Sequence, residues 1–164
     1  MGFTRRKTNN TGKIYHKSTI VDGIKFDSEM ESLYYKYLLE LKEKGIVKDF
    51  ILQPAFPLQE KFIIVEGKII LGSDENFNKL KRKYKAETIS AITYISDFDV
   101  LYTDGHREIV DVKGMETADF KLKLKLFKCK YPELNIRLLK LYRKEWIDLK
   151  DYKKILKENK KRKI

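Results

Sequence analysis

The stretch YISDFDVLYTDGHREIVDVKG, residues 94–114, decides the fold expected for this chain of 164 residues. Val, Ile, Tyr and Phe, which favour β-strands, lie on both sides of a central Thr-Asp-Gly, so the stretch predicts a half-buried β-hairpin. Its strands also carry the acids Asp97, Asp99 and Asp111. Carboxylates that face each other across a sheet repel, so a positive partner is expected nearby.

The length of the hairpin loop decides whether these acids meet. A two-residue loop would pair Asp97 with Val112 and turn Asp111 to the other face, because side chains alternate along a strand. A three-residue loop, with Gly105 in the left-handed conformation, would pair Asp97 with Asp111. We predict the three-residue loop, which also places Lys113 on the same face.

A divalent cation would offset the repulsion between the paired acids. Mg²⁺ typically binds one or two carboxylates and completes its shell with water and substrate phosphate oxygens. Lys113, two residues after Asp111, could direct its ammonium group at the same water or phosphate. Alternatively, Lys113 is a simple ion-pair partner of the acids on an exposed face.

Two stretches of the chain predict helices. Apolar residues at helical spacing between Met30 and Leu41 predict an amphipathic helix that Gly45 ends. The stretch FKLKLKLFKCK, residues 120–130, alternates as a strand would, but eleven residues are long for one strand, so we interpret it as a helix. This helix would need cover from both sides, because its apolar residues form two opposite groups, Phe120, Leu124, Phe127 and Tyr131 against Leu122, Leu126 and Cys129.

The other expected elements are mostly strands. Asp22-Gly23 and Glu66-Gly67 are turn signals that predict two further hairpins. Pro54 and Pro57 interrupt the strand expected at 47–58, which indicates an edge position or a strand end. The order of the elements predicts a mixed α/β fold. We also expect an excursion at 72–87, a strand at 89–101, a strand at 135–143 and a helix at 148–159.

Positive charge is concentrated in three segments. The 36 Lys and Arg exceed the 24 Asp and Glu, and the net charge of +12 implies a polyanionic partner, most simply nucleic acid. The excess gathers at residues 1–17, 121–130 and 153–164. Alternatively, the terminal runs are simply solvated. We expect a basic flexible arm at 1–17, a folded domain at 18–150 and a basic C-terminal helix or tail at 151–164.

Cysteine content and hydropathy indicate the compartment. Cys129 is the only cysteine, which excludes an internal disulfide and suits a reducing cytoplasm. No apolar run approaches the length of a membrane span, and the first residues lack the apolar stretch of a secretory signal. We therefore expect a cytoplasmic protein with no membrane partner.

The acids and the lysine of the hairpin match a known pattern. With Asp97 in the segment SDF, and with Asp111 and Lys113 in the segment DVK, the sequence resembles the PD-(D/E)xK nuclease superfamily. It more closely resembles a family of small bacteriophage proteins, catalogued as a domain of unknown function and related to phage Holliday junction resolvases. That resemblance rests on the segments VDGIKFDSEMES, LQP, AITYISDF, VDVKG and FKLKLKLF.

The resemblance covers about residues 15–131 and has two departures. Ser96 stands in place of the proline of the superfamily name. Residues 60–87 form a long stretch whose local architecture the family pattern does not define.

The resemblance implies a restriction-endonuclease-like mixed sheet with flanking helices. It also implies a Mg²⁺-dependent endonuclease, in which Mn²⁺ can replace Mg²⁺. Glu31 alternatively completes a capping box with Ser28 at the start of its own helix. The implied catalytic residues are Glu31, Asp97, Asp111 and Lys113, and the implied metal ligands are Asp97, Asp111, Glu31 and the carbonyl oxygen of Val112.

The same pattern and the basic segments indicate where DNA would bind. Gln53 matches a recurrent family position, although a buried amide at a sheet end would explain it equally well. Lys121, Lys125 and Lys128 form a stripe on the expected helix, where they contact phosphates or simply keep the helix solvated. Asp99 is expected to support the acids of the site. The candidate DNA-binding residues are Gln53, Lys121, Lys125, Lys128, Arg5, Arg6 and Lys7.

These inferences predict a metal-dependent DNA endonuclease that hydrolyses phosphodiester bonds. The resemblance implies a structure-selective enzyme that resolves Holliday junctions in DNA recombination, acts on branched DNA as a homodimer, and works in the bacterial host cytoplasm if a phage encodes it. One alternative is a nicking or flap repair nuclease with the same chemistry. Another is a noncatalytic nucleic-acid-binding protein whose binding is salt-sensitive and indifferent to divalent metal.

Overall fold

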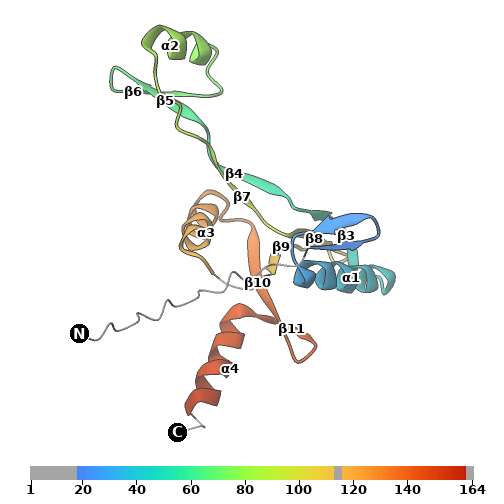
Figure 1. Ribbon diagram of the computed structural model, residues 1–164. Coiled ribbons are helices and arrows are strands. Elements are labelled where there is room, and N and C mark those ends of the chain that lie inside the picture. The colour runs from blue at the N-terminus through green and yellow to red at the C-terminus, as the bar shows by residue number, and fades with distance from the viewer. Residues whose placement is uncertain (1–17, 113–115, 162–164) are drawn as a thin grey trace, which may run out of the picture.

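The computed structural model, which describes residues 18–112 and 116–161, has a five-stranded sheet at its centre (Figure 1). The strand order is β11-β10-β9-β8-β3, with β9 parallel to β10 and the other neighbours antiparallel. One helix packs on each face, so the expected fold class, a restriction-endonuclease-like mixed sheet with flanking helices, is confirmed. We call this part the body; it comprises β3 (Val47–Leu52), β8 (Phe98–Tyr102), β9 (Arg107–Val112), β10 (Asn135–Tyr142), β11 (Glu145–Asp148), α1 (Glu29–Glu43) and α3 (Ala118–Lys130).

α1 covers one face of the sheet. Its N-cap is Ser28, whose hydroxyl oxygen accepts a hydrogen bond from the Glu31 N–H at 3.2 Å. Gly45, with φ +68°, lies just beyond the helix end, where a left-handed residue is common. Leu38 has no exposed surface and lies in the core that α1 forms with β8 and β9. The helix predicted from apolar spacing is confirmed.

α3 covers the opposite face, which confirms the helical interpretation of its alternating sequence. Phe127 has no exposed surface and packs against Phe56 and Tyr94. The expected second cover was wrong: Leu122 and Leu126 are exposed, because no other described residue buries that side of the helix. One side of α3 therefore packs on the sheet, and its opposite side is exposed.

An arm leaves the body between β3 and β8 (Figure 1). We call residues 54–96 the arm and its outer part, residues 60–90, the distal module. The β-hairpin expected at Glu66-Gly67 is confirmed within it. The arm begins as a ribbon of β4 (Ala55–Gln59) and β7 (Ile92–Ile95) and ends in β5 (Phe62–Val65), β6 (Lys68–Leu71) and α2 (Phe77–Tyr84).

The arm corrects one strand prediction. The strand expected at 89–101 is two strands, because β7 pairs with β4 in the arm and β8 pairs with β3 in the body. The break falls at Ser96 and Asp97. Opposite this break, Gln53 has φ +48°, and its N–H donates to the Asp97 carbonyl oxygen at 2.9 Å. A left-handed residue before Pro54 interrupts the facing strand at the same level, so both strands turn together.

Peripheral elements complete the fold. The expected first hairpin is present as β1 (Thr19–Val21) and β2 (Ile24–Phe26), and the expected C-terminal helix is α4 (Leu149–Lys161). The division at residues 17/18 and 150/151 stays a prediction. Within the described residues, no helix is both long and apolar enough to cross a membrane.

Candidate functional site

The loop between β8 and β9 has the register that brings the acids together. Gly105 has φ +90°, and the Tyr102 N–H donates to the His106 carbonyl oxygen at 2.9 Å. The ladder then runs from the pair Leu101 and Arg107 to the pair Phe98 and Val110, so the three-residue loop is confirmed. Asp97 and Asp111 are the next positions along the same ladder. The hairpin is not half-buried as expected, because α1 and α3 cover it from both faces.

Asp99 forms an ion pair with an arginine. The Arg107 guanidinium donates from Nε to Asp99 Oδ1 at 2.7 Å and from Nη2 to Oδ2. This forked geometry is the one that best holds a carboxylate. The ion pair raises the pKa of Arg107, and Asp99 itself is buried. Asp99 therefore serves the hairpin as half of an ion pair.

Asp97 is fixed at both its side chain and its backbone. Its Oδ2 accepts a hydrogen bond from the Val112 N–H at 2.6 Å. Its carbonyl oxygen accepts from the Gln53 N–H at 2.9 Å. The first contact holds the Asp97 carboxylate against the backbone next to Asp111. The two acids are thus brought together at one end of the hairpin.

Asp111 has no exposed surface, and a tyrosine from the arm binds it. The Tyr94 hydroxyl donates to Asp111 Oδ2. Burial raises the pKa of Tyr94, and the negative charges of Asp111 and then Asp97 raise it further. Tyr94 therefore keeps its proton and stays a donor throughout the ordinary pH range. Sequence reasoning missed this residue, although it lies only three positions before Asp97.

Glu31 caps its own helix and also lies at the cavity beside Asp97. Its Oε1 accepts a hydrogen bond from the Ser28 hydroxyl at 2.7 Å, so the capping pair is present. It also lines a cavity of about 50 Å³ together with Asp97, Gln53 and Lys25. The cavity is large enough for water. Lys25 comes from β2, and no motif in the sequence indicated that it lies there.

Gln53 and Ser96 flank the point where the arm joins the body. Gln53 is exposed, so the alternative of a buried amide is wrong. Ser96, which stands at the proline position of the superfamily pattern, has no exposed surface. Its hydroxyl oxygen has no hydrogen-bond partner among the described residues. The Ser96 N–H donates to the Pro54 carbonyl oxygen at 3.2 Å and closes the base of the arm.

The other predicted site residues are scattered or lie outside the described residues. Lys113, Arg5, Arg6 and Lys7 lie outside them. Lys121, Lys125 and Lys128 are exposed on α3, as a phosphate-binding or a solvated stripe would be. Lys128 also lines a separate cavity of about 260 Å³, together with Leu149 and Lys153 of α4.

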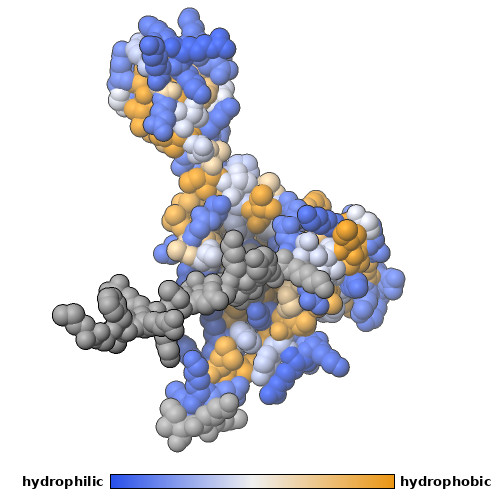
Figure 2. Space-filling model, in the orientation of Figure 1, coloured by the Kyte–Doolittle hydropathy of each residue, from blue (hydrophilic) through white to orange (hydrophobic). Residues whose placement is uncertain are grey.

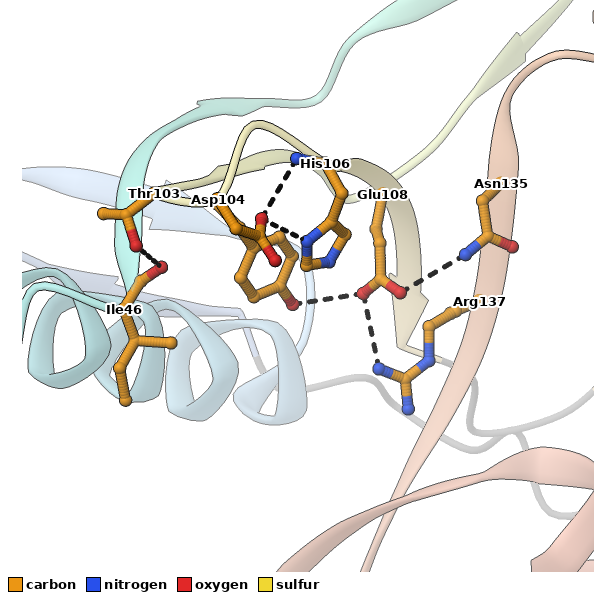
Figure 3. Close-up of polar contacts among 8 residues, drawn as sticks. Ile46, Thr103, Asp104, His106, Glu108, Asn135 and Arg137 are labelled. Carbon is orange, nitrogen blue, oxygen red and sulfur yellow. Dashed lines mark hydrogen bonds and ion pairs between the residues drawn. The ribbon is translucent and has the colours of Figure 1, made fainter.

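The opposite face of the β8–β9 hairpin carries a polar network that does not include the candidate acids (Figure 3). Glu108 is buried and accepts hydrogen bonds from the Tyr102 hydroxyl at 3.1 Å and from Arg137 at 3.3 Å. His106 stacks on Tyr102, with ring centroids 4.0 Å apart, and is paired with Asp104. These contacts join β8, β9 and β10. His106 belongs to this network and does not approach the candidate acids.

Comparison with family models gives one match. Residues 11–146 match the family described as "Protein of unknown function (DUF1064)". The chain belongs to this family. A search of curated proteins and a search of solved structures each found no match. The expected relationship to a family of unknown function is confirmed, and membership of DUF1064 by itself assigns no chemistry.

The donor chemistry of the site fits a hard divalent cation. Asp97 and Asp111 supply carboxylate oxygens, and Mg²⁺ or Mn²⁺ prefers oxygen ligands, of which one or two carboxylates suffice. Within residues 18–112 and 116–161, no three His, Cys, Asp or Glu side chains form a group that could hold a metal ion. A cation here would thus also need backbone, water or substrate oxygens. Glu31 as a metal ligand stays a prediction.

Proposed function

We propose that this protein is a divalent-metal-dependent DNA endonuclease. One observation carries the proposal: the hairpin register brings Asp97 and Asp111 together, with the Val112 N–H bound to Asp97 at 2.6 Å. Lys113 follows directly in the sequence and completes the D-x-K pattern. The resemblance to PD-(D/E)xK nucleases and the net charge of +12 support the same chemistry and a polyanionic substrate.

In the proposed mechanism, Asp97, Asp111 and the Val112 carbonyl oxygen would hold Mg²⁺ or Mn²⁺, and Glu31 would complete the metal or water shell. When bound, the cation neutralises charge on the scissile phosphate and lowers the pKa of the attacking water. Tyr94 keeps the Asp111 carboxylate in one orientation. Lys113 orients the water or takes its proton.

The proposed reaction is hydrolysis of a phosphodiester bond of DNA. The oxygen of water forms a bond to phosphorus, and the bond from phosphorus to the 3′ oxygen breaks. The products carry a 5′-phosphate and a 3′-hydroxyl. The leaving 3′ oxygen takes a proton from solvent. No oxidation state changes, so no redox partner is required.

We further propose that branched DNA is the substrate and that a homodimer acts on it. Resolution of a Holliday junction needs two cuts at matched positions, which two symmetry-related sites supply. If the protein cuts branched DNA while remaining a monomer, in solution scattering with and without a junction, a nicking or flap nuclease explains it better.

The test is cleavage of labelled linear, flap and junction DNA by the purified protein in Mg²⁺, in Mn²⁺ and in EDTA. We expect cleavage in the two metals and none in EDTA. Lys113→Ala and Asp97→Asn should abolish cleavage, while Asp104→Asn, which changes an exposed acid at the tip of the same hairpin, should not. Undiminished cleavage by Lys113→Ala and Asp97→Asn would refute the site.

The competing function is a noncatalytic nucleic-acid-binding protein, which the charge of +12 favours. It predicts salt-sensitive binding that does not change between EDTA and Mg²⁺. It also predicts that no DNA is cut under any of these conditions. It gives Asp97 and Asp111 no role, and for that reason we rank it second.

A further inference from the structure

The arm leaves the body at the candidate site. Its two strands begin and end beside Gln53 and Asp97, which are joined by a backbone hydrogen bond of 2.9 Å. The ribbon then pairs outward from Ala55 and Ile95, with one shift of register between Pro57 and Gln59. Phe62 and Ile89 extend this ladder beyond β4 and β7 with two reciprocal backbone bonds of 3.0 and 2.8 Å. Backbone hydrogen bonds along the ribbon therefore connect the distal module to the part of the body that holds the candidate acids.

The distal module has a core of its own, separate from those of the body. Ile63, Val65 and Phe77 are buried together, and Leu80 of α2 packs against them. Ile63 has no exposed surface. This small core fixes α2 against β5. The outward face of α2 is thus presented in one orientation.

α2 and the residue after it carry a dense positive charge. The stretch FNKLKRKYK, residues 77–85, contains five cations and no acid. All five are exposed, and in the part of the chain that the structure describes none of them forms an ion pair. Lys81, Arg82 and Lys85 line an open hollow on one side of the helix. Figure 2 shows the distal module as a largely hydrophilic lobe at the end of the arm.

This arrangement disfavours the isolated helix. Like charges three or four residues apart, such as Lys79 and Lys83, destabilise a helix by a few tenths of a kcal/mol per pair. A polyanion would remove that repulsion and would gain entropy from counterions released by its phosphates. Among the described residues, the cores of the body include none from the distal module, so packing of the sheet does not explain why the module carries these charges.

We propose that α2 binds the phosphate backbone of duplex DNA some distance from the cleavage site. This inference rests on the proposed function for the position of the site. From Ala55 to Phe62 the ribbon spans seven steps, or roughly 23 Å at about 3.3 Å per residue. At about 3.4 Å per base pair, α2 meets the duplex on the order of seven base pairs from the site. The arm then makes the enzyme require a minimum length of duplex beside the cut.

The test compares two variants of equal net charge in EDTA, where binding is read without cleavage. The first carries Lys81→Gln, Arg82→Gln and Lys85→Gln. The control carries Lys36→Gln, Lys44→Gln and Lys48→Gln, all exposed in the body. We expect the α2 variant to bind a duplex of about 30 base pairs at least tenfold more weakly, with a salt slope smaller by about 2.7, because each lost phosphate contact removes about 0.9. The control should bind as wild type does.

A short duplex locates the contact. On a hairpin-closed duplex of about 6 base pairs, roughly 20 Å long, wild type and the α2 variant should bind equally, because α2 extends past its end. The proposal is overturned if the α2 variant matches the control on the long duplex, or if its defect is as large on the short one. If wild type binds DNA but never cuts it, the proposed function fails, and these binding measurements still decide the role of α2.

Discussion

Two of the antiparallel hairpins, β8–β9 in the body and β5–β6 in the distal module, differ in what surrounds them. β8 and β9 are enclosed by α1 and α3, and three acids of the hairpin each have a separate partner: Arg107 for Asp99, the Val112 N–H for Asp97, and Tyr94 for Asp111. β5 and β6 have cover on one side only, and Ile64, Ile69 and Leu71 are exposed. Enclosure fixes acids that would otherwise repel. The outer hairpin needs only enough core to hold exposed cations in place.

The sharpest way to separate the two hairpins is to remove one charge of the inner one. Asp111→Asn should lower the single-turnover cleavage rate by about a thousandfold, on the scale of losing a charged group that stabilises the reaction's transition state. The α2 triple variant, at saturating protein, should keep the wild-type rate. Circular dichroism should show both proteins folded. A near-normal rate for Asp111→Asn would remove the functional distinction between the hairpins.

Core truncations should separate the body and the arm in stability. Phe127→Ala removes a fully buried ring from the body and should cost about 3–5 kcal/mol of unfolding free energy. Phe77→Ala should loosen the distal module and leave the body's midpoint unchanged. Trp146 reports on the body alone, since it is the only tryptophan and packs on Tyr34 with ring centroids 4.9 Å apart. If the unfolding midpoint read from Trp146 fluorescence shifts equally in both variants, the two regions unfold as one unit.

The Tyr94 contact should have an intermediate effect, because it joins arm and body. Tyr94→Phe removes the hydroxyl that orients Asp111 and should lower cleavage or Mg²⁺ affinity by about 10- to 100-fold, as loss of a group that orients a metal ligand does. Titration of the rate with Mg²⁺ separates those two effects. Tyr37→Phe, on an exposed part of α1, is the matched control. A wild-type Mg²⁺ titration for Tyr94→Phe would leave this contact with a purely structural role.

The smallest expected effect is a response of the body to alkaline pH. Burial, and then Glu108, raises the pKa of Tyr102 to about 12. The unfolded chain loses this proton near pH 10, whereas the folded chain keeps it. The stability that the protonated Tyr102 hydroxyl contributes is therefore full below pH 10 and is lost as pH rises towards 12. Tyr102→Phe should cost about 1 kcal/mol at pH 8 and flatten this decline. Urea unfolding between pH 8 and 12 measures it, and a decline as steep as in wild type would contradict it.

Local sequence signals predicted the parts of the fold that depend on spacing. The apolar spacing of α1 and the left-handed Gly105 of the β8–β9 loop are determined within a few residues. The register of the acids followed from that loop. The lysine-rich alternation of α3 was harder, because strand and helix both fit it locally. Length decided between them.

The elements that were missed depend on contacts distant in sequence or on unusual turns. β11 follows a turn at Arg143 and Lys144, which have φ +51° and +70° without the Gly or Asn that marks such turns. α2 shows only a short apolar spacing, of Phe77, Leu80 and Tyr84. In the candidate site, the Tyr94 contact depends on the arm crossing towards β9. No spacing rule relates those two positions.

The insertion of the arm between β3 and β8 has a consequence for the order of folding. Leu52 pairs with Phe98, although a long stretch of chain separates them. Closing so wide a loop at random costs entropy that grows with its length. The tight turn at Glu66 and Gly67 joins β5 to β6, and Phe62 at the start of β5 also pairs with Ile89, shortly before β7. We therefore expect the distal module to form before the base of the arm, because its Phe62–Ile89 pair shortens the loop that must close when the strands next to Gln53 and Asp97 meet.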